Sequence, residues 1–216
     1  MKNRSIILNL LTLAALAGFA GCATSGYKQA DKTGEGIAEF RDAIVNGKKA
    51  IDDTMKSLGQ VAASANTDPR KAFEHYSKNV ANLESAAGKA RKCSQDVKEQ
   101  GKTYFEQWQK QLADVKNPDI RALAEQRKAK LQETFDNIRQ LVEPLKAQFN
   151  PWLSDLKDLQ KYLANDLTIA GVDAAKPLFA KTQTEGQEVQ RSMDALVAEL
   201  NSVAAAITPA KAGSKK

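Results

Sequence analysis

The sequence is poor in the residue types from which catalytic and metal sites are usually built. Its 216 residues include a single histidine, His75, and two cysteines, Cys22 and Cys93. One histidine cannot supply the two Glu-x-x-His pairs of a helical di-iron site, and a zinc site also needs a larger set of ligands. Residues 34–36 (Gly-Glu-Gly) do not fit a phosphate-binding loop, and no serine stands in the strand–turn–helix context of a nucleophile. We therefore expect neither an enzyme nor a metal or cofactor site.

Two carboxylate pairs, Asp52 with Asp53 and Asp155 with Asp158, are the remaining candidates for acid–base chemistry. Adjacent residues point to different sides of a helix, and we expect the second pair to face water among lysines. We also expect His75 at the surface or at its boundary. These residues do not suggest a catalytic constellation.

Strong charge of one sign is absent as well. The formal net charge is +6, of which the first four residues contribute two units and the last six residues three. The remaining body is nearly neutral, which does not fit a nucleic-acid-binding protein. Aromatic residues make up only 6% of the chain, Ala, Lys, Gln and Leu are abundant, and no long segment alternates apolar with polar residues. This composition predicts an all-α protein.

The first apolar run lies at the N-terminus, where Lys2 and Arg4 precede it. Residues 6–20 are apolar except at two positions, and about fifteen residues are too few to span ~30 Å of hydrocarbon comfortably. A basic start, a short apolar run and small residues before the cleavage point are typical of a secretory signal. We predict that residues 1–21 are a signal peptide.

Residues 20–22 (Ala-Gly-Cys) resemble the bacterial lipobox, with Phe19 in the place of the usual leucine. The resemblance implies that Cys22 is lipidated and becomes the first residue of the mature chain. Several acyl chains on one cysteine anchor a protein stably. Ala23 follows instead of aspartate, which implies the periplasmic face of the outer membrane. The alternative is an ordinary signal peptide in which Cys22 occurs by chance.

Behind the anchor, residues 22–35 are small, polar and glycine-bearing, and we predict a flexible tether there, although a helix could begin as early as Tyr27. Four amphipathic stretches follow, and residues 36–207 are predicted to form one bundle domain. Their apolar stripes cover residues 36–63, 69–115, 118–163 and 176–207. Residues 208–216 are predicted to be a basic, disordered tail.

Short loops between long amphipathic helices predict an elongated antiparallel four-helix bundle with coiled-coil-like packing. The alternative is a three-helix bundle with the first helix detached. Ser94 and Gly101 lie in the heptad register of the second helix and would let a neighbouring helix approach closely. Pro144 and Pro151 predict kinks in the third helix.

The hairpin over residues 104–128 is predicted to protrude past the first and fourth helices by about 15–20 Å. Its tip is the candidate interaction surface, and Arg127 falls opposite Trp108, where a cation–π contact is feasible. The alternative is that the apolar residues of the tip only join the two helices. The candidate contact residues are Tyr104, Phe105, Trp108, Leu112, Leu123 and Arg127.

The same geometry places this tip, the start of the first helix and the end of the fourth at one end of the bundle. That end is tethered, so the tip and the tail lysines Lys211, Lys215 and Lys216 would face the membrane. Cys93 has no intramolecular partner once Cys22 carries lipid. It is expected to be a small buried side chain or, alternatively, to form an intermolecular disulfide.

With the helices placed, the sequence resembles a family of uncharacterised bacterial lipoproteins filed as a domain of unknown function. The resemblance extends over residues 26–207 and implies an all-helical, coiled-coil-like exported protein; it brings no catalytic residue. It rests on Tyr104-Phe105 with Trp108, on Leu153-Ser154-Asp155-Leu156, and on Tyr162-Leu163 through Asp166-Leu167-Thr168.

The function we expect is that of a non-enzymatic envelope lipoprotein, a helical scaffold, spacer or partner-binding module, with no nucleic acid among its partners. The partners are the membrane, through the lipid, and an envelope protein that the sequence does not identify. One alternative is a bundle that opens to bind lipid or another hydrophobic ligand. Another is a structural lipoprotein attached to peptidoglycan, because Lys215-Lys216 resembles the C-terminal lysine of the major cell-wall-linked lipoprotein. The oligomeric state stays open.

Overall fold

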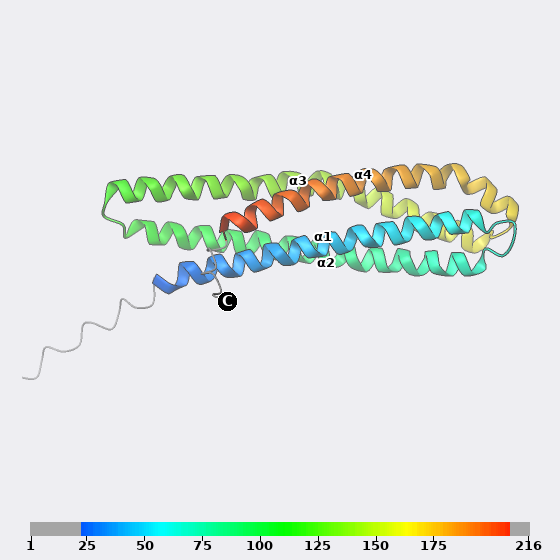
Figure 1. Ribbon diagram of the computed structural model, residues 1–216, viewed down its shortest axis with the longest axis horizontal. Coiled ribbons are helices and arrows are strands. Elements are labelled where there is room, and N and C mark those ends of the chain that lie inside the picture. The colour runs from blue at the N-terminus through cyan, green and yellow to red at the C-terminus, as the bar shows by residue number, and fades with distance from the viewer. Residues whose placement is uncertain (1–22, 208–216) are drawn as a thin grey trace, which may run out of the picture.

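Four long helices make up the described part of the chain in the computed structural model, which covers residues 23–207 (Figure 1). No strand occurs within that range, so the predicted all-α class is confirmed. The helices are α1 (Ala23–Ala63), α2 (Arg70–Ala113), α3 (Pro118–Asn165) and α4 (Ile169–Ile207). The predicted signal peptide, the lipidated Cys22 and the tail with Lys211, Lys215 and Lys216 lie outside the described residues.

Each helix packs on two neighbours and the bundle closes into a ring. Helix α1 contacts α2 and α4, and α3 contacts the same two helices from the other side. Polar contacts link α1 to α2 between Asp53 and Asn79, and α3 to α4 between Asp155 and Lys181. Nearer the other end of α3, Arg127 bonds to α4 at Ala206, so residue numbers on α3 fall as those on α4 rise. The order is antiparallel, and the alternative with a detached first helix is wrong.

Helix α1 begins at Ala23, so the prediction of a flexible tether before residue 36 is wrong for residues 23–35. Within this segment Ala30 is 8% exposed and Thr33 is fully buried. The glycines that suggested flexibility are contact points instead. A Cβ atom at Gly36 would lie 2.1 Å from Gln100 Oε1 of α2, so the missing side chain makes room for a glutamine.

The longer α1 also changes the shape of the hairpin end. A Cβ atom at Gly26 would lie 2.9 Å from Gln111 Oε1, so α1 accompanies α2 almost to its last turn. The predicted protrusion past both α1 and α4 is therefore wrong for α1. It holds for α4, whose end at Ile207 stops well short of the α2–α3 loop, as the red end of the ribbon in Figure 1 shows.

Helix α3 runs as one helix through Pro144 and Pro151, and its second half is inclined to the first (Figure 1). Its start matches the predicted cap. Asn117 accepts hydrogen bonds from the backbone N–H groups of Asp119 and Ile120 at 2.9 and 3.2 Å. This cap fixes where the α2–α3 loop ends and the exposed start of α3 begins.

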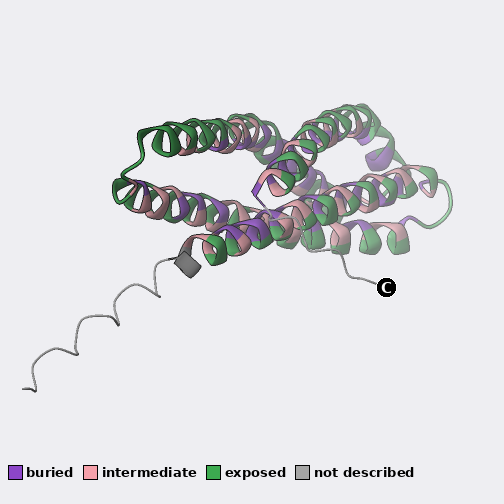
Figure 2. Cartoon of the chain, turned by 60° about the vertical axis from the view of Figure 1, so that its left-hand side comes forward, coloured by how far each residue is buried: buried purple, intermediate pink, exposed green. Residues whose placement is uncertain are grey.

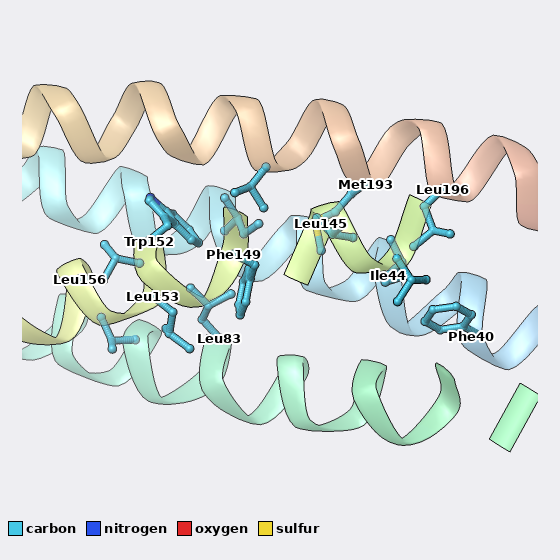
Figure 3. Close-up of a cluster of buried hydrophobic side chains, with 14 of the residues drawn as sticks. Phe40, Ile44, Leu83, Leu145, Phe149, Trp152, Leu153, Leu156, Met193 and Leu196 are labelled. Carbon is cyan, nitrogen blue, oxygen red and sulfur yellow. The ribbon is translucent and has the colours of Figure 1, made fainter. Parts of the chain in front are cut away.

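The core contains buried residues of all four helices. Figure 3 shows the part of it around Phe149, Trp152 and Leu156. Trp152 is 2% exposed, and its indole N–H donates to the Thr182 carbonyl of α4 at 2.8 Å. The buried Tyr76 hydroxyl donates to the Leu156 carbonyl of α3 at 2.7 Å, and burial raises the pKa of Tyr76. Each of these two large rings therefore carries a satisfied polar atom into the core.

Candidate functional site: the α2–α3 hairpin

The aromatic residues predicted for the tip are packed inward. Tyr104 is 9% exposed, and its ring centroid lies 5.3 Å from that of Phe105 and 5.5 Å from that of Trp108. Phe105 in turn meets Phe135 of α3 edge-on at 5.3 Å. Leu112 is 4% exposed. Tyr104 and Leu112 are thus wrong as surface contacts, and the cluster joins helices, as the alternative interpretation predicts.

Arg127 stabilises the end of α4. Its Nη2 atom donates to the Ala206 carbonyl at 2.8 Å, one residue before α4 ends. A cation beside the last carbonyls of a helix also interacts favourably with the helix dipole. The predicted pairing of Arg127 with Trp108 is therefore replaced by a cap on the neighbouring helix.

The exposed apolar surface of the tip comes from the first turns of α3. Ile120 is 56% exposed and Leu123 is 69% exposed, one helical turn apart. Because α4 ends before this level, no fourth helix covers them. Figure 2 shows this stretch of α3 almost entirely in the colour of exposed residues. Of the predicted contact residues, Leu123 keeps its place, and Ile120 joins it although its position in the stripe predicts a buried side chain.

A groove separates α2 from α3 below the tip. Its cavity volume is about 300 Å³, and it runs from Ser94 to Phe105 on α2 and from Gln132 to Lys146 on α3. The prediction that Ser94 and Gly101 allow close approach of a helix is wrong in its details. A Cβ atom at Gly101 would lie 2.7 Å from Phe135 Cε1, so the glycine accommodates a ring, and Ser94 lines the groove.

Cys93 lies half-buried on α2, beside the groove-lining Ser94. Burial, with further contributions from Glu39 and Asp96, raises the pKa of its thiol. A raised pKa lowers the thiolate fraction at neutral pH and hence the rate of thiol exchange. Cys93 is thus only partly buried, and the raised pKa of its thiol slows thiol exchange.

The other residues considered for catalysis, four aspartates and His75, form hydrogen bonds or ion pairs or are exposed to solvent. Asp52 accepts a hydrogen bond from Gln190 at 2.7 Å, and His75 is exposed, as predicted. The remaining three carboxylates form ion pairs: Asp53 with Lys49, Asp155 with Lys181 and Asp158 with Lys161. Within residues 23–207, no three His, Cys, Asp or Glu side chains gather into a metal-binding group. Over the same range, none of the helices combines the length and the hydropathy needed to cross a bilayer.

Comparison with known proteins identifies the family. The model of a family described as "Protein of unknown function (DUF2959)" matches residues 19–207. The chain belongs to this family. The match covers the entire bundle and includes Cys22 and the three residues before it, Phe19, Ala20 and Gly21. A search of curated proteins and a search of solved structures each found no match.

Proposed function

We propose that this DUF2959 protein is a non-enzymatic envelope lipoprotein, anchored through Cys22 at the periplasmic face of the outer membrane, whose bundle is a rigid scaffold. The sequence before Cys22 supports anchoring, through its basic start, its short apolar run and its lipobox-like end. The non-enzymatic role is supported by the two candidate carboxylate pairs, whose four side chains form ion pairs or a hydrogen bond and do not face one another across a pocket. We propose that its partners are the membrane and an envelope protein.

The observation that carries this proposal is the start of α1 at Ala23, directly after Cys22. A helix that packs on α2 down to Gln111 leaves little freedom between a lipid on Cys22 and the body. The anchored end would then be the end that bears Ile120 and Leu123. The bundle would extend from the membrane by about 60 Å, the length of 41 helical residues at 1.5 Å each.

Depth-dependent fluorescence quenching tests this orientation. We expect a tryptophan introduced by Leu123→Trp to be quenched by brominated lipids when the full lipidated protein is placed in anionic vesicles. An exposed apolar side chain favours the interfacial region of a bilayer. The matched control is Ile169→Trp, because Ile169 is 52% exposed and begins α4 at the opposite end of the bundle.

Trp108 and Trp152 contribute the same background to both variants. The proposal expects the added quenching in the Leu123→Trp protein to exceed that in the Ile169→Trp protein severalfold. Equal quenching of the two, or stronger quenching at position 169, would show that the tip does not face the membrane.

A further inference from the structure

The α2–α3 groove lies next to a smaller cavity in the core. The groove of about 300 Å³ shares Ser94, Val142 and Lys146 with a second cavity of about 60 Å³. That second cavity is lined by core residues of all four helices, several of which are labelled in Figure 3. They include Phe40, Leu83, Leu145, Phe149, Met193 and Leu196.

The floor of the groove consists of apolar side chains. Val97, Ile138 and Val142 are 3%, 5% and 7% exposed, and the rings of Phe105 and Phe135 close one end. Such a floor offers an apolar chain a surface on which it is shielded from water on one side.

The rim of the groove carries an excess of positive charge. Four basic and two acidic side chains line it, a net charge of +2: Lys98, Lys102, Arg139 and Lys146, with Asp136 and Glu143. Asp136 pairs with Arg139 at 3.3 Å, Glu143 with Lys146 at 3.0 Å, and Lys102 lies 3.9 Å from Glu106 outside the groove. Among the described residues Lys98 has no ion-pair partner. It remains available for an anionic group outside the protein.

The dimensions fit one acyl chain. Residues 94–105 of α2 span about 16 Å at 1.5 Å per residue. One leaflet of a bilayer, and hence one extended acyl chain, occupies about half of the ~30 Å hydrocarbon thickness. A volume of about 300 Å³ lies at the lower end of small-molecule sites, which suits a ligand with a single chain.

We infer that the α2–α3 groove binds a long-chain fatty acid, with its chain between Val97 and Val142 and its carboxylate at Lys98 and Arg139. The apolar floor accounts for the chain, and the positive rim accounts for the carboxylate. The site depends on α2 and α3 alone, so it goes beyond the proposed scaffold function and does not require the Cys22 anchor.

Photo-crosslinking with a defined probe tests the site. The full lipidated protein in non-ionic detergent is titrated with palmitate that bears a diazirine at the chain end, irradiated, and mapped by peptide mass spectrometry. We expect saturable crosslinks within residues 94–105 and 132–146 that unlabelled palmitate displaces. Absence of saturable labelling there would overturn the proposal.

Two variants with matched controls locate the ligand. Lys98→Glu combined with Arg139→Glu reverses two exposed rim charges and should raise half-saturation about tenfold, since each exposed charge pair contributes up to a few-fold. Lys78→Glu combined with Arg191→Glu makes the same charge change on exposed positions outside the groove and should leave half-saturation unchanged. Equal effects of the two double variants would contradict the site.

A second variant blocks the chain itself. Ser94→Phe fills the junction of the two cavities and should abolish crosslinking while thermal unfolding stays cooperative. Ser85→Phe, at an exposed position of the same helix, is its control. Palmitate labelling that survives Ser94→Phe, or a groove closed by a second copy of the chain in a dimer that excludes palmitate, would overturn the inference.

Discussion

Replacing Trp152 with alanine is expected to lower the free energy of unfolding by about 3–5 kcal/mol, the range for removing a large buried ring. Trp152 is 2% exposed, packs against Phe149 with ring centroids 5.8 Å apart, and donates to the Thr182 carbonyl at 2.8 Å. A Cβ atom at Gly186 would lie 3.0 Å from the Trp152 ring, which shows how closely α4 approaches it. The loss therefore combines a cavity with a missing donor between α3 and α4.

Urea unfolding followed by circular dichroism measures this change. Trp152→Phe keeps a ring and loses the hydrogen bond, so it should cost about 1–3 kcal/mol. Trp108→Ala, at the half-buried aromatic cluster of the tip, is the matched control and should cost clearly less than Trp152→Ala. If the two alanine variants were equally stable, the contact of Trp152 with α4 would contribute no more to stability than the aromatic cluster of the tip.

Placing a charge at Thr33 is expected to lower the free energy of unfolding by about 2–4 kcal/mol, the consequence of an unpaired buried charge. Thr33 is fully buried, and its hydroxyl donates to the Gln29 carbonyl at 2.8 Å. Thr33→Glu would force a carboxylate between α1 and its neighbours. If the charge instead drives residues 23–36 off the bundle, the loss of unfolding free energy cannot exceed what the packing of that segment contributes.

The neighbouring Lys32 provides the control for this experiment. Lys32 is exposed, and Lys32→Glu should change the unfolding free energy by less than about 0.5 kcal/mol. Thermal or urea unfolding of both variants in the full chain gives the comparison. A flexible segment would tolerate both substitutions equally, so equal stabilities would contradict the packing of the first turns of α1.

The sequence predicts the four helices and their antiparallel order well because each helix carries a long apolar stripe. The start of α1 escapes that reasoning. Gly26 and Gly36 indicate flexibility when they are considered locally, but in the bundle they face Gln111 and Gln100 of α2. The contact depends on residues some sixty to ninety positions away, and local propensity carries no information about it.

The buried face of α3 is wider than the single stripe that the sequence predicts. Trp152 lies on that stripe, three residues after Phe149 and four before Leu156, whereas Leu153 lies beside it, and both are buried. Helix α3 packs on both α2 and α4, so its apolar face takes in adjacent positions. The run of two large apolar residues after Pro151 is the signal that could have revealed this width.

Within the α2–α3 hairpin, the apolar stripe predicts burial correctly for some residues and wrongly for others. Tyr104 and Leu112 lie on the apolar stripe and are buried, whereas Ile120 and Leu123 lie on a stripe and are exposed. The difference comes from where α4 ends, and a stripe cannot report that. The groove could not be predicted from the sequence either. The small side chain of Ser94 predicts a close contact between helices, but in the bundle Ser94 lines an open space.

Hydrogen–deuterium exchange of residues 26–37 tests the central claim most directly, namely that α1 is folded and packed from the residues next to Cys22. In the full-length protein, we predict that backbone amides of residues 30–37 exchange as slowly as those of residues 44–58 in the middle of α1. Exchange of residues 30–35 to completion within seconds, while residues 44–58 stay protected, would contradict the account and restore a flexible tether.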